Sequence, residues 1–208
     1  MTPGDVETRT PRIAAVVLAA GMSSRMGGAN KLLAAVDGEA VVARVVDAAL
    51  ASCAAPVVVV TGHDADGVCA ALAGRQITRA HNPDYARGLS SSLHAGLGAL
   101  GREVDGALIC LGDMPWVGAA DLDALIAAFA HRAERPICVP VFDRKRGNPV
   151  LWPARYFAAL RALDGDVGGR DLLRRCAGEV LEVPTSDPGV TRDVDTPADL
   201  SASPRRPA

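Results

Sequence analysis

Residues 13–31 read IAAVVLAAGMSSRMGGANK, and this stretch is the most informative feature of the chain. Its opening run is apolar and partly β-branched, which predicts a buried strand over 13–19. The chain then continues in small residues with two cations, Arg25 and Lys31. Because a glycine-rich turn after a strand exposes backbone N–H groups, this turn favours binding of a polyanion such as a triphosphate. The usual phosphate-loop patterns, GxxxxGK[ST] and GxGxxG, are absent, so a surface turn with solvated cations stays an alternative.

Apolar runs of strand length alternate with apolar residues at helical spacing along the following part of the chain. Further strands are predicted over 56–61, 77–81, 106–111 and 137–141, and helices over 41–50, 89–100 and 122–129. This alternation is typical of βαβ units. We therefore predict a single α/β domain, Rossmann-like, with a mostly parallel sheet flanked by helices.

The pattern loosens after residue 141. Shorter strands are predicted over 148–152, 180–183 and 190–194, and helices over 154–163 and 170–176. The two ends, 1–12 and 201–208, are polar and contain prolines, so we expect them to be tails around a domain of residues 13–200.

The composition limits the functions open to this chain. Its 208 residues suffice for one α/β domain with a substantial core. The net charge of −2 gives no global attraction to nucleic acid or anionic membranes, and 3% aromatic residues argue against a base-stacking surface. The five cysteines are scattered without a CxxC pair, and the apolar runs are far shorter than the about 20 residues that span a bilayer. We expect a cytoplasmic protein with no nucleic-acid or membrane partner.

The string LAAGMSSRMGGANKLL at 18–33 resembles the signature of the molybdenum cofactor nucleotidyltransferases, part of a superfamily that includes sugar-nucleotide pyrophosphorylases. Five further segments follow in the order of that family: RGLSSSL at 87–93, GDMP at 112–115, GNPVL at 147–151, GDVGGR at 165–170 and DVDTPAD at 193–199. Guanylyltransferases of the family read LAGG where cytidylyltransferases read LAAG, and this chain has Ala20 at the third place. The resemblance is therefore to the molybdenum cofactor cytidylyltransferases, and it implies a nucleotide-diphospho-sugar transferase type of fold.

The resemblance assigns two segments to the nucleotide. They comprise Leu18, Ala19, Ala20, Gly21, Arg25 and Lys31 in the first, and Gly88, Leu89, Ser90, Ser91 and Ser92 in the second. Arg25 and Lys31 would hold the triphosphate, and Lys31 would neutralise charge on the α-phosphate as pyrophosphate leaves. The serines would line the cytosine and ribose pocket, although they equally fit a plain cap on free helix N–H groups. Thr61 and Gly62, at the end of a predicted strand, are expected near the base.

Asp113 directly follows the predicted strand 106–111, at the edge where open α/β sheets bind ligands. It also fits a plain turn before a proline, but the GDMP resemblance implies a catalytic role as a ligand of Mg²⁺. Magnesium usually takes one or two carboxylates plus substrate phosphates, and the family has its second carboxylate at the place of Asp195. Asp193 shares a face with it on an extended segment, and we expect Asp193 to lie outside the ligand set.

Glycine-rich segments of the C-terminal half resemble those that face the family's second substrate, a phosphorylated pterin. They contain Gly147, Asn148, Gly168, Gly169 and Arg170. Arg170 begins a predicted helix, where a cation is poorly placed for the helix dipole, and this favours a role in binding an anionic group. The alternative is an ordinary loop before a helix. The resemblance also implies a molybdenum hydroxylase apoenzyme or an insertion chaperone as partner.

The leading hypothesis is an enzyme that joins CTP to the terminal phosphate of a molybdopterin-type cofactor and releases pyrophosphate. Transfer from GTP, or onto another phosphorylated acceptor, is the nearest alternative. A nicotinamide-dependent reductase on the same fold would need GxGxxG and an acidic residue after the second strand, where this chain has Thr61 and Gly62. A catalytically silent nucleotide-binding regulator is disfavoured by the presence of Lys31, Asp113 and Asp195.

Overall fold

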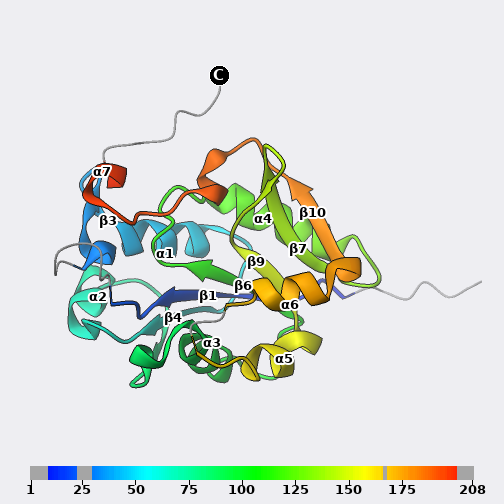
Figure 1. Ribbon diagram of the computed structural model, residues 1–208, viewed down its shortest axis with the longest axis horizontal. Helices are drawn as coiled ribbons and strands as arrows, with labels where there is room; N and C mark the ends of the chain where they lie inside the picture. The colour runs from blue at the N-terminus through cyan, green and yellow to red at the C-terminus, as the bar shows by residue number, and fades with distance from the viewer. Residues whose placement is uncertain (1–8, 23–29, 166–167, 201–208) are drawn as a thin grey trace, which may run out of the picture.

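The computed structural model describes residues 9–22, 30–165 and 168–200, and these form an eight-stranded mixed sheet between two layers of helices (Figure 1). The strand order is β10-β7-β9-β6-β1-β4-β5, with β8 paired to β7. The strands are β1 Ile13–Ala19, β4 Val57–Thr61, β5 Thr78–His81, β6 Gly106–Leu111, β7 Ile137–Phe142, β8 Lys145–Arg146, β9 Val150–Pro153 and β10 Val180–Pro184, and a separate hairpin pairs β2 Ala35–Val36 with β3 Glu39–Ala40.

Helices connect most of the strands, as βαβ units require. The α-helices are α1 Val41–Ala51, α2 Ala65–Ala71, α3 Leu89–Gly98, α4 Ala119–Ala130, α5 Phe157–Arg161, α6 Arg170–Arg175 and α7 Pro197–Leu200, with single 3₁₀ turns η1 Lys31–Leu33, η2 Tyr85–Arg87, η3 Ala154–Tyr156, η4 Ala177–Glu179 and η5 Pro188–Thr191. In Figure 1, α1 and α4 lie on one side of the sheet and α3 and α5 on the other. None of the helices in the described ranges is both long and apolar enough to cross a bilayer.

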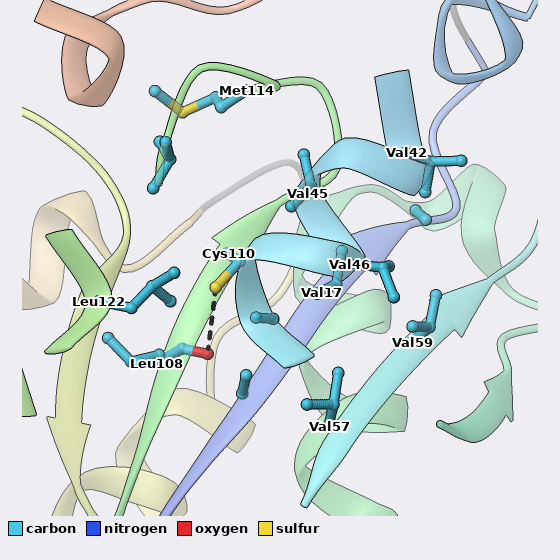
Figure 2. Close-up of a cluster of buried hydrophobic side chains, with 14 of the residues drawn as sticks. Val17, Val42, Val45, Val46, Val57, Val59, Leu108, Cys110, Met114 and Leu122 are labelled. Atoms are coloured by element: carbon cyan, nitrogen blue, oxygen red, sulfur yellow. Dashed lines mark hydrogen bonds between the residues drawn. The ribbon is translucent and has the colours of Figure 1, made fainter. Parts of the chain in front are cut away.

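Strand β1 is central because it is apolar on both faces. It pairs in parallel with β4 on one side and with β6 on the other. Alternate side chains such as Val16 and Val17 enter opposite cores, one against α3 and α5, the other against α1 and α4. Figure 2 shows the second of these cores, where Val17 lies among the valines of α1 and β4.

Two strands, β8 and β9, run antiparallel to the others, and β9 lies inside the sheet. β9 follows β7 in the chain but lies between β6 and β7, antiparallel to both, with Ala107 opposite Trp152 and Cys138 opposite Leu151. The loop that enters β9 therefore lies at the edge of the sheet where β6 and β7 end. The segments that were predicted to bind ligands lie at this edge.

The predicted α/β domain with its mostly parallel sheet is confirmed, and the predicted strands up to residue 183 lie within two residues of their predicted bounds. Helix α4 begins three residues earlier than predicted, and the helix predicted over 154–163 is the 3₁₀ turn η3 followed by the shorter α5. The strand predicted over 190–194 is wrong. Asp187 accepts a hydrogen bond from Gly189 N and caps η5, with Pro188 at its first position, so the chain turns where extension was expected. Helix α2 was not predicted. Within the segment predicted as an N-terminal tail, Arg9 and Arg12 pair with Asp105 and Glu103, just before β6.

Candidate active site

Three charged side chains from distant parts of the chain meet at the carboxyl edge of the sheet. Lys31 Nζ lies 2.6 Å from Asp113 Oδ2 and 2.8 Å from Asp195 Oδ1. Lys31 follows β1, Asp113 follows β6, and Asp195 precedes α7. Their side chains are 16%, 20% and 34% exposed, so the charges are partly screened from water but open to a ligand.

The backbone around Lys31 is fixed on both sides of the lysine. Asn30 caps η1, because its Oδ1 accepts a hydrogen bond from Leu32 N at 3.1 Å. The Leu32 side chain is buried in the core beneath α1. The ammonium group is therefore held at the sheet edge by local structure as well as by its two carboxylate partners.

The electrostatics of Lys31 favour its charged form. Burial lowers the pKa of the ammonium, but the charge and hydrogen bonds of Asp113 and Asp195 outweigh this effect and raise the pKa above its ordinary value. Lys31 is thus a permanent cation at neutral pH.

Asp193, two residues before Asp195, also lies at this site. One carboxylate oxygen from each of Asp113, Asp193 and Asp195 lies within 4.8 Å of the others. Val194 N donates a hydrogen bond to Asp113 O at 2.8 Å, which ties this segment to the end of β6. Among the described residues, Asp113 Oδ1 is a buried oxygen without a hydrogen-bond partner. Oxygen donors at this spacing, one of them unsatisfied, fit a hard divalent cation.

Asp199 holds the backbone of the segment that contains Asp195, and it was not identified from the sequence. Its Oδ2 accepts hydrogen bonds from Asp195 N at 3.1 Å and from Thr196 N at 2.7 Å. These bonds, with that of the Thr196 hydroxyl first, lower the pKa of Asp199. Thr196 and Asp199 are spaced as in the T-x-x-D form of a capping box, and this pattern is the signal that would have found them.

The residues predicted to bind the nucleotide lie at the ends of β1 and α3. Ala19 and Ala20 are buried, so only their backbone can face a ligand, and Ala20 O already accepts a hydrogen bond from His63 N. A Cβ on Gly62 would lie 2.8 Å from Ala20 Cβ and 2.7 Å from Tyr85 Cβ, which requires glycine where β4 ends beside β1. Arg25 lies outside the described residues. The base contact of Thr61 and Gly62 stays a prediction.

The three serines of the second segment do not cap α3 with their side chains. The N-cap is Gly88, and the hydroxyls donate instead to carbonyl oxygens, Ser90 to Gly165 O and Ser91 to Gly88 O, both at 2.8 Å. The alternative of capping serines is therefore wrong. Ser90 and Ser92 are 2% and 5% exposed, because they face the protein interior. A role of Ser90–Ser92 in binding the nucleotide stays a prediction.

The five residues assigned to a second substrate line a single cavity of about 770 Å³. They are Gly147, Asn148, Gly168, Gly169 and Arg170. Leu18 and Leu111, at the ends of β1 and β6, also line it, so the cavity opens beside the strands that lead to Lys31 and Asp113. Apolar side chains such as Trp152 form much of its wall, and Arg146 and Arg174, not identified from the sequence, join Arg170 as cations.

Gly147 is required by a close approach of two chain segments. A Cβ at this position would overlap Val190 O, the carbonyl that accepts a hydrogen bond from Asn148 N at 2.8 Å. We expect Gly147→Ala to lower the free energy of unfolding by about 1–3 kcal/mol, measured by urea denaturation, because the backbone must shift. Gly101→Ala is the control, since a Cβ there meets nothing within 4 Å. Equal stability losses for both variants would contradict the steric explanation.

Residues 15–180 match the family model described as MobA-like NTP transferase domain. The bifunctional protein GlmU of Sorangium cellulosum strain So ce56 is 32% identical over 190 residues, which cover 88% of this chain but only 39% of GlmU. The nicotine blue oxidoreductase of Paenarthrobacter nicotinovorans is 29% identical over 198 residues, covering 91% of this chain and 95% of that protein. The crystal structure of Rv0371c from Mycobacterium tuberculosis H37Rv, complexed with manganese, has a TM-score of 0.78 and 27% identity, with 91% of this chain and 96% of that chain covered.

Proposed function

Because the chain belongs to the MobA-like NTP transferase family, we propose that it transfers CMP from CTP to the terminal phosphate of a molybdopterin-type acceptor and releases pyrophosphate. The observation that carries this proposal is the ammonium of Lys31 between Asp113 and Asp195, beside a cavity for a second substrate. The proposal includes delivery of the product to a molybdenum hydroxylase apoenzyme or its insertion chaperone in the cytoplasm.

The proposed reaction needs positioning and charge rather than a protein nucleophile. An oxygen of the acceptor phosphate attacks the α-phosphorus of CTP and forms a new P–O bond. The bond from the α-phosphorus to the bridging oxygen breaks, and pyrophosphate carries the released electron pair away. Lys31, with Arg25 as its proposed partner, supplies fixed positive charge for the triphosphate as this negative charge shifts.

A divalent cation fits the acidic residues of the site. Asp113 and Asp195 would hold it, with Mg²⁺ as the proposed ion and Asp193 as a neighbouring charge. When bound, such an ion neutralises triphosphate oxygens and orients them for in-line attack. The manganese in the structure of the similar Rv0371c supports a divalent ion in this fold.

The cavity supports an acceptor with an apolar part and an anionic group. The partly exposed Leu89, Leu111 and Leu173 of its wall favour a partly apolar body. Arg146, Arg170 and Arg174 favour a phosphate at the same place.

CTP is expected to be the preferred donor, with kcat/KM about tenfold or more above that for GTP, because the signature reads LAAG with Ala20 at its third place. The test measures pyrophosphate release by the purified protein with Mg²⁺, molybdopterin and each nucleoside triphosphate in turn. Reactions without acceptor, and with a hexose 1-phosphate in its place, are the controls. Equal or better turnover with GTP would overturn the cytidylyl assignment.

A second candidate follows from the likeness to nicotine blue oxidoreductase, which extends over nearly the full length of both chains. A reductase would oxidise NADH or NADPH, and the same preparation can be assayed at 340 nm with a suitable dye acceptor. The charged group of Lys31, Asp113 and Asp195 favours the transferase. Transfer of a nucleotidyl group requires charges that hold a triphosphate and a cation, whereas hydride transfer does not require a carboxylate pair bridged by an ammonium.

A further inference from the structure

Asn82 is a buried amide that follows β5 at the carboxyl edge of the sheet and is 3% exposed. Its backbone N–H donates to Thr61 O at 2.7 Å, at the end of β4. Its Nδ2 donates to Ser91 Oγ at 2.9 Å and to Ser92 Oγ at 3.1 Å, and its Oδ1 accepts from Asp84 N at 3.0 Å. A buried amide is costly unless it is hydrogen-bonded, and every polar group of this one has a partner.

The bonds of Asn82 continue to the turn before α3. Ser91, which accepts from Asn82, donates its own hydroxyl to Gly88 O at 2.8 Å. Gly88 has φ of +102° and ψ of −176°, a conformation that is essentially restricted to glycine. Asn82 therefore holds, through Ser91, a strained turn at the start of the helix that carries the proposed nucleotide segment.

Serine hydroxyls contribute little free surface to that segment. Ser90 and Ser92 are nearly fully buried, and the Ser91 hydroxyl hydrogen is directed to Gly88 O. A base that lies against this segment would therefore meet mainly backbone N–H and C=O groups around Gly88. The position of those groups depends on the turn, and the turn depends on Asn82.

We propose that Asn82 is a positioning residue that sets nucleobase selectivity by fixing the Gly88 turn. The proposal rests on the function proposed above, since it takes the segment 87–92 as the place of the base. Asn82 does not touch the nucleotide itself. It acts through Ser91, so its loss weakens the preference among the bases rather than the chemistry at the α-phosphate.

Two variants test this role. Asn82→Ala removes all the side-chain bonds. Asn82→Asp keeps the shape and the bond from Asp84 N, but it reverses the two bonds to the serines, because the Ser91 hydroxyl then donates to the carboxylate instead of to Gly88 O. We expect either variant to reduce the ratio of kcat/KM for the best nucleotide over the poorest by about tenfold, the worth of a hydrogen bond or two. The change is expected mainly in KM, with kcat at saturating nucleotide less affected.

Thr185→Val is the matched control, because it removes two partly buried hydrogen bonds at the β10 edge of the sheet. Thr185 Oγ1 donates to Asp121 Oδ1 at 2.9 Å and accepts from Asp187 N at 3.1 Å. A similar loss of melting temperature without a change in the nucleotide ratio is expected there. If kcat/KM falls by the same factor for every nucleotide in the Asn82 variants, the proposal is overturned and Asn82 has only a structural role.

Equilibrium titrations of each nucleoside triphosphate separate this proposal from the proposed function. If the wild-type protein binds nucleotides but releases no pyrophosphate, the proposed function fails, and the ratio of Kd values still decides the role of Asn82. A ratio of Kd values between the poorest and the best nucleotide that is tenfold smaller in the variants supports the positioning role of Asn82. Binding of no nucleotide by the wild-type protein would overturn both proposals.

Discussion

Lys31→Met is expected to lower kcat by on the order of 10²–10³, because it removes the positive charge that is needed most as pyrophosphate leaves. Methionine has a side chain of similar length to lysine, and the neighbouring Leu32 stays buried, so the fold is expected to persist. The measurement is steady-state pyrophosphate release with saturating CTP and acceptor, together with the thermal unfolding curve.

The control for Lys31→Met is Lys145→Met, since Lys31 and Lys145 are the two lysines of the chain. Lys145 lies exposed on β8, and its replacement should leave kcat unchanged. Mn²⁺ binding without nucleotide, followed by electron paramagnetic resonance, should be as tight or tighter in Lys31→Met, because an ammonium no longer competes for Asp113 and Asp195. Near-normal turnover by Lys31→Met would show that the lysine has no part in the chemistry.

Asp113→Asn and Asp195→Asn are each expected to lower kcat/KM by on the order of 10²-fold, because an amide keeps the shape but removes the charge that a hard cation requires. The losses should be non-additive in the double variant if both carboxylates hold one ion. Titration of activity with Mg²⁺ should show that both variants need a higher concentration of the metal.

Asp193→Asn serves as the internal comparison for the metal ligands. Its carboxylate lies near the other two but on an exposed residue, so a milder loss is expected. If Asp193→Asn lowers activity strongly and Asp195→Asn does not, the second metal ligand is Asp193 rather than Asp195.

The local pattern of apolar residues was enough to predict the central strands and helices of the fold. The run Ile13–Ala19 is apolar at every position, and it forms the strand with neighbours on both sides. The placement of β9 was not predictable in this way, because its pairing with β6 depends on residues some 45 positions apart. Val190 and Val194 are both buried, yet the turn begun by Asp187 and Pro188 separates them, and buried valines alone had suggested a strand.

The charged residues of the site could be named from the resemblance, and the structure brings Lys31, Asp113 and Asp195 into contact. Asn82 could not, because a histidine–asparagine–proline sequence after a short strand looks like an ordinary turn. Its importance depends on hydroxyls nine and ten residues later, and only the packing of β5 against α3 brings them together.

The contact between Lys31 and Asp195 joins residues 164 positions apart. During synthesis at about 5–20 residues per second, the lysine is made roughly 8–33 s before this carboxylate exists. A nascent chain can complete β1, β6 and the pair of Lys31 with Asp113 well before the second acid arrives. The partly made protein therefore lacks one carboxylate of the proposed cation site, and the proposed centre is complete only after the segment with Asp195 has docked.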